Sequence, residues 1–551
     1  MGYGLLWLES LAAALLLVAT AAAWYAQAKR RVWAWVFLFL AELAPLLVAA
    51  VETFASGFLA YHGLEHNWLA YTVSWTVCLV AGIAIILRRG LRRVEGVRPA
   101  SGWPAARLAV GFAAALTLHL VTLWNMDTTM RIKLSAVRLE AGAMVVAAAP
   151  PRVPDAQNAA FVYEKAFEAI QRINERDPRW SPVYKAKSGT WYQDFNRPDF
   201  KLDPEFREFL KQHQTTLALL KRAAAMPGCY FEHDYARPSL DMTLPELAKL
   251  REAARLLAAD ARVKAADGQV RAALENVAAI HAIAGHVTGE PMLISGLVAV
   301  AVNDTGLSAL EGILTATTPT AADLAVLRRD ETTSLRRVLN RCLIGEEAFG
   351  LSAFAMLSGE DNSDLLYREL GLQPHCLAPL LTVPWRVFLL PDELTAYRKH
   401  LRDMRDLSLY SYQDAQAHIR ELGGEQMARR SGILTQLILP ALMRCFGTFT
   451  RAEARSRLGQ LAVAVAAYHA QTGRFPAKLE SLAPEYIGEV PLDPYDDQPL
   501  RFRGGSAGVT LYSVGPDLTD EGGKEFDSRT EKGDLVFRVG SVPAQAAAGG
   551  P

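Results

Sequence analysis

Apolar positions divide this chain into regions with different periodicities. Four largely apolar stretches come first, near residues 5–26, 32–53, 68–87 and 106–125. Each has about the 20 residues that a helix needs to cross the hydrocarbon core of a bilayer. Apolar residues then recur at helical spacing as far as about residue 430, and strand-like runs follow after residue 500.

This pattern predicts a multi-domain protein. We expect a block of four transmembrane helices over 1–125, a linker over 126–155 that is rich in Pro and Ala over 145–155, and a mostly α-helical domain over 156–430. A small α+β module is expected over 431–540. The last residues, 541–551, are rich in Ala and Gly and are expected to be a disordered tail.

Loop charges predict the orientation of the membrane block. Lys29, Arg30 and Arg31 lie in the first loop and five arginines in the third, 88–105, whereas the loop 54–67 has no Lys or Arg. Basic loops stay on the cytoplasmic side. The helical domain and the α+β module are therefore expected to be extracytoplasmic, in a multi-pass protein of a bacterial inner membrane with the lipid bilayer as a partner.

Glu42 lies in the middle of the second apolar stretch, three residues before Pro45. Intramembrane carboxylates are costly and often mark ion or substrate paths. The sequence leaves two interpretations open. Glu42 either lines a solvated path in a small transporter or sensor, or turns to the interior of the helix bundle and is hydrogen-bonded there.

The clearest helical signal outside the membrane block is a hairpin over 245–288. Apolar faces recur on both sides of a turn at Asp267 and Gly268. The hairpin resembles a single tetratricopeptide-type pair, but no second copy follows, and such repeats need about three copies to bury a continuous core. We therefore expect a helical packing layer, with further helices near 291–315, 320–345, 346–358 and 391–421.

This helical region carries no catalytic signature. His281 and His286 miss the i, i+4 spacing that places two histidines on one metal, and no Gly-x-Ser-x-Gly, phosphate-loop or Gly-x-Gly-x-x-Gly motif occurs. The sequence thus predicts no catalytic and no cofactor-binding residue. A hydrolase would need a pocket that brings acids or histidines from distant segments within hydrogen-bond reach of each other.

Cysteine usage and net charge exclude few classes of protein. None of the five cysteines forms a Cys-x-x-Cys pair. Cys229, Cys342, Cys376 and Cys445 would face an oxidising compartment, where three disulfide pairings are possible and buried free thiols are an equal alternative. Basic and acidic residues balance at 58 each, so no global charge indicates a nucleic-acid partner.

The C-terminal module begins with an apolar helical stripe over 458–468, and Gly473 and Pro476 stop that helix. Strand-like runs follow over 500–503, 509–513 and 533–539. An acidic, Gly-rich loop separates the last two runs. The order predicts one helix packed on a small sheet.

Five short motifs in this order resemble the globular head of the major pseudopilin of type II secretion systems. The motifs are residues 468–476 at the end of the helix, Asp493-Pro494-Tyr495, residues 511–517, Gly522-Gly523, and Gly533-Asp534-Leu535. The resemblance covers about a hundred residues, under a fifth of the chain. It implies an α+β head, with the apolar run 433–443 and its Pro440 standing where the family has the lower half of its long helix.

The resemblance also implies a calcium site, because the acidic loop of pseudopilin heads folds around a calcium ion. Asp517, Asp520 and Asp534 are the expected side-chain ligands. Independently of the family, calcium takes six to eight oxygens, which carboxylates and carbonyls of a flexible loop supply. Leu518 departs from the glycine of the family, and the loop differs in length. The alternative is an acidic hairpin in which each Asp bonds its own backbone.

These observations favour a membrane-anchored structural or interaction protein of the cell envelope, with a pseudopilin-like extracytoplasmic module and a possible link to secretion or surface assembly. Envelope or secretion proteins are the expected partners, nucleic acid is not, and no enzyme activity is expected. Two alternatives stay open: a membrane-tethered envelope hydrolase with its site in the helical domain, and a transporter or sensor that uses Glu42.

Overall fold

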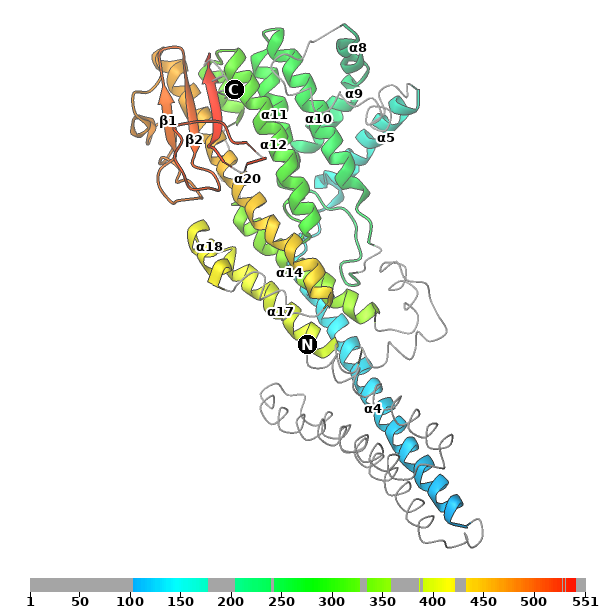
Figure 1. Cartoon of the computed structure of the whole chain (residues 1–551). Coiled ribbons are helices and arrows are strands. Elements are labelled where there is room, and N and C mark those ends of the chain that lie inside the picture. The colour runs from blue at the N-terminus through cyan, green and yellow to red at the C-terminus, as the bar shows by residue number, and fades with distance from the viewer. Residues whose placement is uncertain are drawn as a thin grey trace, which may run out of the picture. The chain divides into compact units, whose positions relative to one another are not determined.

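The structure is a computed structural model that describes residues 103–176, 204–238, 242–327, 334–357, 386, 390–421, 433–527, 529–530 and 532–541 (Figure 1). Three of the four predicted membrane stretches, and Glu42, lie outside these residues. The fourth lies within α4 (Trp103–Ala148), a helix of 46 residues. The predicted linker differs from the structure, because α4 continues through most of it. Extended backbone begins only at Pro150 and Pro151, which cannot continue a helix.

Two compact units make up the chain. One comprises residues 1–137 and 354–395, and the other comprises 138–353 and 396–551. In the first unit, Asp127 is buried and forms ion pairs of 2.7 Å with Arg131 and with Arg386. All elements described below, apart from the ends of α14 and α17, belong to the second unit.

One helix among the described residues, α12 (Leu293–Ala316), is long and apolar enough to cross a membrane. However, 56% of its most apolar part is buried among the other elements. It packs against α10, α11, α20 and β3, as the core helix of a folded domain does. The predicted hairpin is confirmed: α10 (Pro245–Ala266) and α11 (Val270–Val287) meet at Gly268, whose φ of 74° suits glycine.

Three shorter helices, α5 (Ala160–Arg176), α8 (Pro204–Gln212) and α9 (Gln214–Ala224), pack on this layer and share its core (Figure 1). Alanines dominate the facing surfaces, among them Ala253, Ala254 and Ala258, which are at most 1% exposed. Small side chains let the helix backbones approach closely, so the layer is thin and tightly packed.

A second group of helices follows α12. Thr320 caps α13 (Ala321–Leu324) with a capping box to Asp323, and a 3-10 turn, η4 (Ala325–Leu327), continues it. α14 (Leu335–Leu357), α17 (Leu390–Leu407) and α18 (Tyr412–Glu421) come next. The sequence predicted a break between residues 345 and 346, and this was wrong, since α14 runs through it.

The C-terminal module is one long helix with a three-stranded sheet. α20 (Ile433–Thr472) is continuous through Pro440 over 40 residues and ends at Gly473, with φ 70°. The predicted stripe is confirmed, because Leu458, Leu461, Ala462 and Val465 are all fully buried. After the 3-10 turn η7 (Leu479–Leu482), strands β1 (Arg501–Gly504), β2 (Gly508–Ser513) and β3 (Leu535–Gly540) follow close to their predicted positions.

The sheet is antiparallel with the order β1-β2-β3. Arg501 pairs with Tyr512 at one end of the first hairpin, and Gly508 pairs with Gly540 across the second. All residues of the central strand β2 are buried. Both α20 and α12 pack against β3, so the sheet joins the helical layer at that edge.

Candidate functional site

The predicted calcium ligands have different environments in the acidic loop. Asp517 accepts a hydrogen bond from its own backbone at Thr519 N (3.2 Å) and a longer one from Gly533 N (3.4 Å). Asp520 accepts from Gly522 N (2.9 Å) and pairs with Arg501 (3.2 Å). These contacts match the alternative interpretation, in which each Asp bonds the backbone two residues ahead.

Asp534 differs from the other two. It is fully buried, and its Oδ2 accepts from Gly523 N at 2.6 Å, while the backbone of Glu521 is a second, less well aligned hydrogen-bond partner of the carboxylate. Burial, followed by the nearby carboxylates of Glu521 and Asp520, raises the pKa of Asp534 to about 6. The structure thus places Asp534 near Asp520 and Glu521. The described residues do not bring ligand atoms of Asp517, Asp520 and Asp534 together as a metal-binding group.

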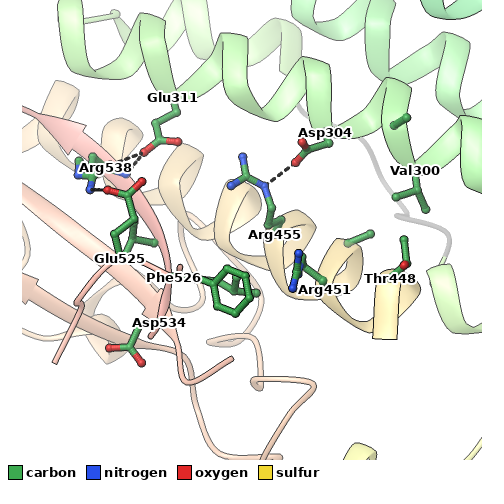
Figure 2. Close-up of a pocket in the computed structure, with 14 residues that line it drawn as sticks. Val300, Asp304, Glu311, Thr448, Arg451, Arg455, Glu525, Phe526, Asp534 and Arg538 are labelled. Atoms are coloured by element: carbon green, nitrogen blue, oxygen red, sulfur yellow. Dashed lines mark hydrogen bonds and ion pairs between the residues drawn. The ribbon is translucent and has the colours of Figure 1, made fainter. Parts of the chain in front are cut away.

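A pocket of about 370 Å³ lies between α12, α20 and the C-terminal strand (Figure 2). Its charged side chains largely neutralise one another. Figure 2 shows Arg455 reaching Asp304, at 2.5 Å, and Arg538 lying between Glu311 and Glu525, at 3.6 and 2.8 Å.

Arg451 places its guanidinium 4.3 Å from the ring centroid of Phe526 in the same pocket, a cation–π contact. Arginines that are already paired in this way offer little to an anionic ligand. We therefore interpret the pocket as part of a polar seam, a set of ion pairs that attaches the sheet and α20 to α12 of the helical layer.

A different group of side chains converges in the helical layer. His233, Glu246 and Glu290 present ligand atoms that all lie within 4.8 Å of one another. Each comes from a different segment: the loop between α9 and α10, the first turn of α10, and the connection between α11 and α12. The two glutamates are 6% and 4% exposed.

The loop that carries His233 is held in place by Asn158. The Asn158 side chain donates to Tyr230 O (2.9 Å) and accepts from Tyr230 N (2.8 Å), and Ala159 N donates to Gly228 O (2.9 Å). These bonds pin the start of the loop to α5. His233 follows three residues later, so its position is restrained before it contacts either glutamate.

Hydrogen bonding within the group is incomplete. Nε2 of His233 lies 3.2 Å from Oε1 of Glu246, yet neither atom has an aligned hydrogen bond among the described residues. Glu290 Oε2 accepts from the Ser295 hydroxyl at 2.5 Å. The buried hydroxyl of Tyr235 also has no partner in the described part of the chain.

Burial dominates the electrostatics of this group. It raises the pKa of Glu290 to about 7; the Ser295 hydrogen bond and His233 oppose this shift, and Glu246 adds to it. Burial lowers the pKa of His233, but Glu246 and Glu290 outweigh it and the net pKa is raised. Burial also raises the pKa of the Cys229 thiol, and Glu290 and Glu246 raise it further. Cys229 therefore lies within electrostatic reach of both glutamates.

No pattern in the sequence indicates this group. Glu246 follows Pro245 in a first helical turn, where acids are common, and Glu290 precedes Pro291 in an ordinary connection. His281 and His286, the two histidines considered above as a metal-binding pair, have separate partners. His281 contacts Asn303 at 2.8 Å, and His286 contacts the Tyr163 hydroxyl at 2.9 Å.

The cysteines with described side chains, Cys229, Cys342 and Cys445, form no disulfide with one another, whereas Cys376 lies outside the described residues. No protein-family model, curated protein or solved structure matches this chain. The resemblance to pseudopilin heads therefore stays a prediction from the motifs.

Proposed function

We propose that this chain is a multi-pass protein of a bacterial inner membrane whose extracytoplasmic part serves as a structural and interaction module of the cell envelope. The apolar stretches and the basic loops of the N-terminal block support the location. The pseudopilin-like motifs support the connection with secretion or surface assembly.

One observation carries the interaction role: the two edges of the C-terminal sheet differ. At β3, the backbone N–H of Arg538 donates to Glu311 of α12 (3.1 Å), so this edge is held by the helical layer. At the other edge, β1 pairs with β2 alone among the described strands, and Arg503 and Gly504 are exposed. An open edge strand is a template for an added strand. We infer that an extended segment of an envelope partner binds along β1.

The same geometry argues against assembly into a fibre of pseudopilin type. α20 is covered by the chain's own α12, through Asn303 to Ser456 (2.8 Å) and Asp304 to Arg455 (2.5 Å). A helix that is already packed in this way is not available to neighbouring copies. The module is expected to act as a fixed docking head.

Photo-crosslinking in intact cells tests this proposal. A photoreactive amino acid at Arg503 should give a discrete adduct with an envelope protein, whereas the same amino acid at Glu168, exposed on α5, should not. In parallel, Ser506→Cys in the β1–β2 turn should react with a membrane-impermeant maleimide from outside the inner membrane. No adduct from position 503, or labelling only after lysis, would count against the proposal.

The hydrolase alternative gains little from the His233, Glu246 and Glu290 group. The group meets one requirement, because acids and a histidine from distant segments converge. However, the glutamates are at most 6% exposed, so an envelope polymer does not reach them in this structure. The transporter or sensor alternative depends on Glu42, which lies outside the described residues.

Calcium binding by the acidic loop remains a separate proposal. It is supported by Asp534, a buried carboxylate with the carboxylates of Glu521 and Asp520 nearby. If calcium binds there, it should raise the melting temperature of the full chain relative to chelator. Asp534→Asn should abolish that rise, and Asp527→Asn, on the exposed side of the loop, should preserve it. An equal melting temperature with and without calcium in the wild type would contradict this proposal.

A further inference from the structure

We propose that His233, Glu246 and Glu290 form a binding site for one divalent transition-metal ion, Zn²⁺ or Mn²⁺, which fastens the loop 225–238 to the helical layer. This inference does not depend on the proposed envelope function. It rests on three observations in the described residues: the convergence of the ligand atoms, the charge balance, and the incomplete hydrogen bonding of the group.

The distances suit a single ion. Two ligands of a tetrahedral Zn²⁺ lie about 3.4 Å apart, since each bond measures about 2.0–2.2 Å, and His233 Nε2 and Glu246 Oε1 already lie 3.2 Å apart. The three ligand atoms lie within 4.8 Å of one another. The Glu290 carboxylate must therefore approach the other two ligand atoms by up to about 1.4 Å, a movement that rotation of its side chain supplies. The restrained loop and the two helix ends supply a largely preformed site.

The charges also fit a dication. Among the described residues, His233 is the basic side chain that forms an ion pair with either carboxylate. Two ionised glutamates with a neutral histidine carry two negative charges, and burying an uncompensated charge is costly. A divalent ion neutralises both carboxylates and leaves His233 in the neutral form that binds metals. Without a metal, the group balances its charge only when His233 and Glu290 are both protonated, so the dication takes the place of two protons.

The incomplete hydrogen bonding of the group provides further support. Buried polar groups in proteins are nearly always hydrogen-bonded. Here His233 Nε2 and Glu246 Oε1 have each other as ion-pair partner at 3.2 Å, without good hydrogen-bond alignment, and the buried hydroxyl of Tyr235 has no hydrogen-bond partner among the described residues. A metal ion would accept lone pairs from the first two atoms. The Tyr235 ring lies edge to face with the His233 ring, with 5.7 Å between the centroids.

The ligand set favours a transition metal over calcium or magnesium. Imidazole nitrogen is a common ligand of zinc, and mixed nitrogen and carboxylate sets suit zinc and manganese. Calcium prefers six to eight oxygens, and magnesium keeps several waters. A site with three protein ligands in a buried layer supplies too few oxygens for either.

Metal binding by the full chain tests the proposal. The protein, purified in detergent without a polyhistidine tag and stripped with chelator, is equilibrated with Zn²⁺ or with Mn²⁺, desalted and analysed for bound metal. We expect one ion per chain and a rise in melting temperature. Glu246→Gln and Glu290→Gln should each weaken binding at least tenfold. Glu311→Gln, which changes a buried glutamate outside the group, should bind as the wild type does.

Stability in chelator separates loss of the site from loss of the fold. Glu290→Gln removes a buried carboxylate, so without metal it should melt at a higher temperature than the wild type while no longer responding to metal. Hydrogen exchange should show that metal slows exchange in the loop 225–238 of the wild type alone. Absence of stoichiometric Zn²⁺ and Mn²⁺ binding by the wild type would overturn the proposal. So would equal binding by the wild type and the two glutamine variants.

Discussion

Glu290 couples the helical layer to pH. Burial raises the pKa of Glu290 from 4.5 to about 7. The neighbouring Glu246 raises this pKa further, whereas the Ser295 hydrogen bond and His233 lower it. The folded state therefore holds a proton that the unfolded state releases at moderate pH. Stability from this group is complete below about pH 4.5 and is lost as the pH rises through about 7. The pKa of His233 is also raised, so its contribution has the same sign.

The expected result is a pH-dependent difference between two proteins. In chelator, the free energy of unfolding of the wild type should fall by about 1–3 kcal/mol relative to Glu290→Gln between about pH 5 and pH 8. Urea denaturation at several pH values measures this difference. Cys229 and Tyr235, which also face Glu290, stay protonated throughout this range because burial raises both pKa values. A difference that stays constant or grows with pH would show that the Glu290 pKa is not raised.

Asp493 holds the turn that precedes the sheet. It is fully buried and accepts hydrogen bonds from Tyr495 N (3.1 Å), Ser513 Oγ (2.9 Å) and Val514 N (2.9 Å). Asp493→Ala leaves these donors unpaired, and we expect a loss of about 2–4 kcal/mol in the free energy of unfolding. Asp527→Ala removes comparable bonds at an exposed position, to Arg529 N and Thr530. Chemical denaturation should show that the free energy of unfolding of Asp527→Ala lies within about 1 kcal/mol of that of the wild type.

These residues show what local sequence can and cannot predict. The role of Asp493 was predictable, because an Asp before a proline in a turn accepts nearby backbone amides. The turn bonds of Asp517 and Asp520 were foreseen as one alternative. His233, Glu246 and Glu290 were not, because each is ordinary in its own segment. Their convergence arises only when the loop and two helix ends pack together.

Helices and strands were predicted better than the connections between them and their boundaries. The hairpin over 245–288 and the strands carried clear periodicity, and Gly473 marked the end of α20. The linker assignment over 126–155 was too long, since no proline interrupts the helix before Pro150. The break placed before residue 346 was also wrong. Gly345 is a weak helix former, but in α14 it serves a tertiary contact.

That contact explains the glycine. A Cβ at Gly345 would lie 1.4 Å from the carbonyl oxygen of Pro291, so α14 touches the connection that carries Glu290. Gly345→Ala must displace backbone, and we expect it to destabilise the protein by about 3 kcal/mol or more. A Cβ at Gly312 of α12 has no atom within 4 Å. Gly312→Ala should therefore stabilise the protein by about 0.5–1 kcal/mol. Thermal denaturation of the two variants should show shifts of opposite sign.

α12 links the two parts of the larger unit. It packs in the layer with α10 and α11, and it also packs against α20 and β3. Arg455 and Arg538 add polar contacts across the same seam, to Asp304 and to Glu311 (Figure 2). The sequence presented the helical domain and the C-terminal module as separate regions. Because they share α12, we expect them to unfold as one cooperative structure.

Gly459 of α20 offers a test of this coupling. A Cβ there would meet the Leu307 side chain of α12 and approach Phe537 of β3 within 4 Å, so Gly459→Leu should force α20 away from both. Native-state hydrogen exchange on the full chain should then show faster exchange in both α12 and β3. The free energy of opening should fall by a similar amount in the two elements. Gly447→Leu, at an open position of the same helix, serves as the matched control and should leave both unchanged. Faster exchange in β3 with full protection of α12 would mean that the head unfolds independently, and the rigid docking head proposed above would have to be given up.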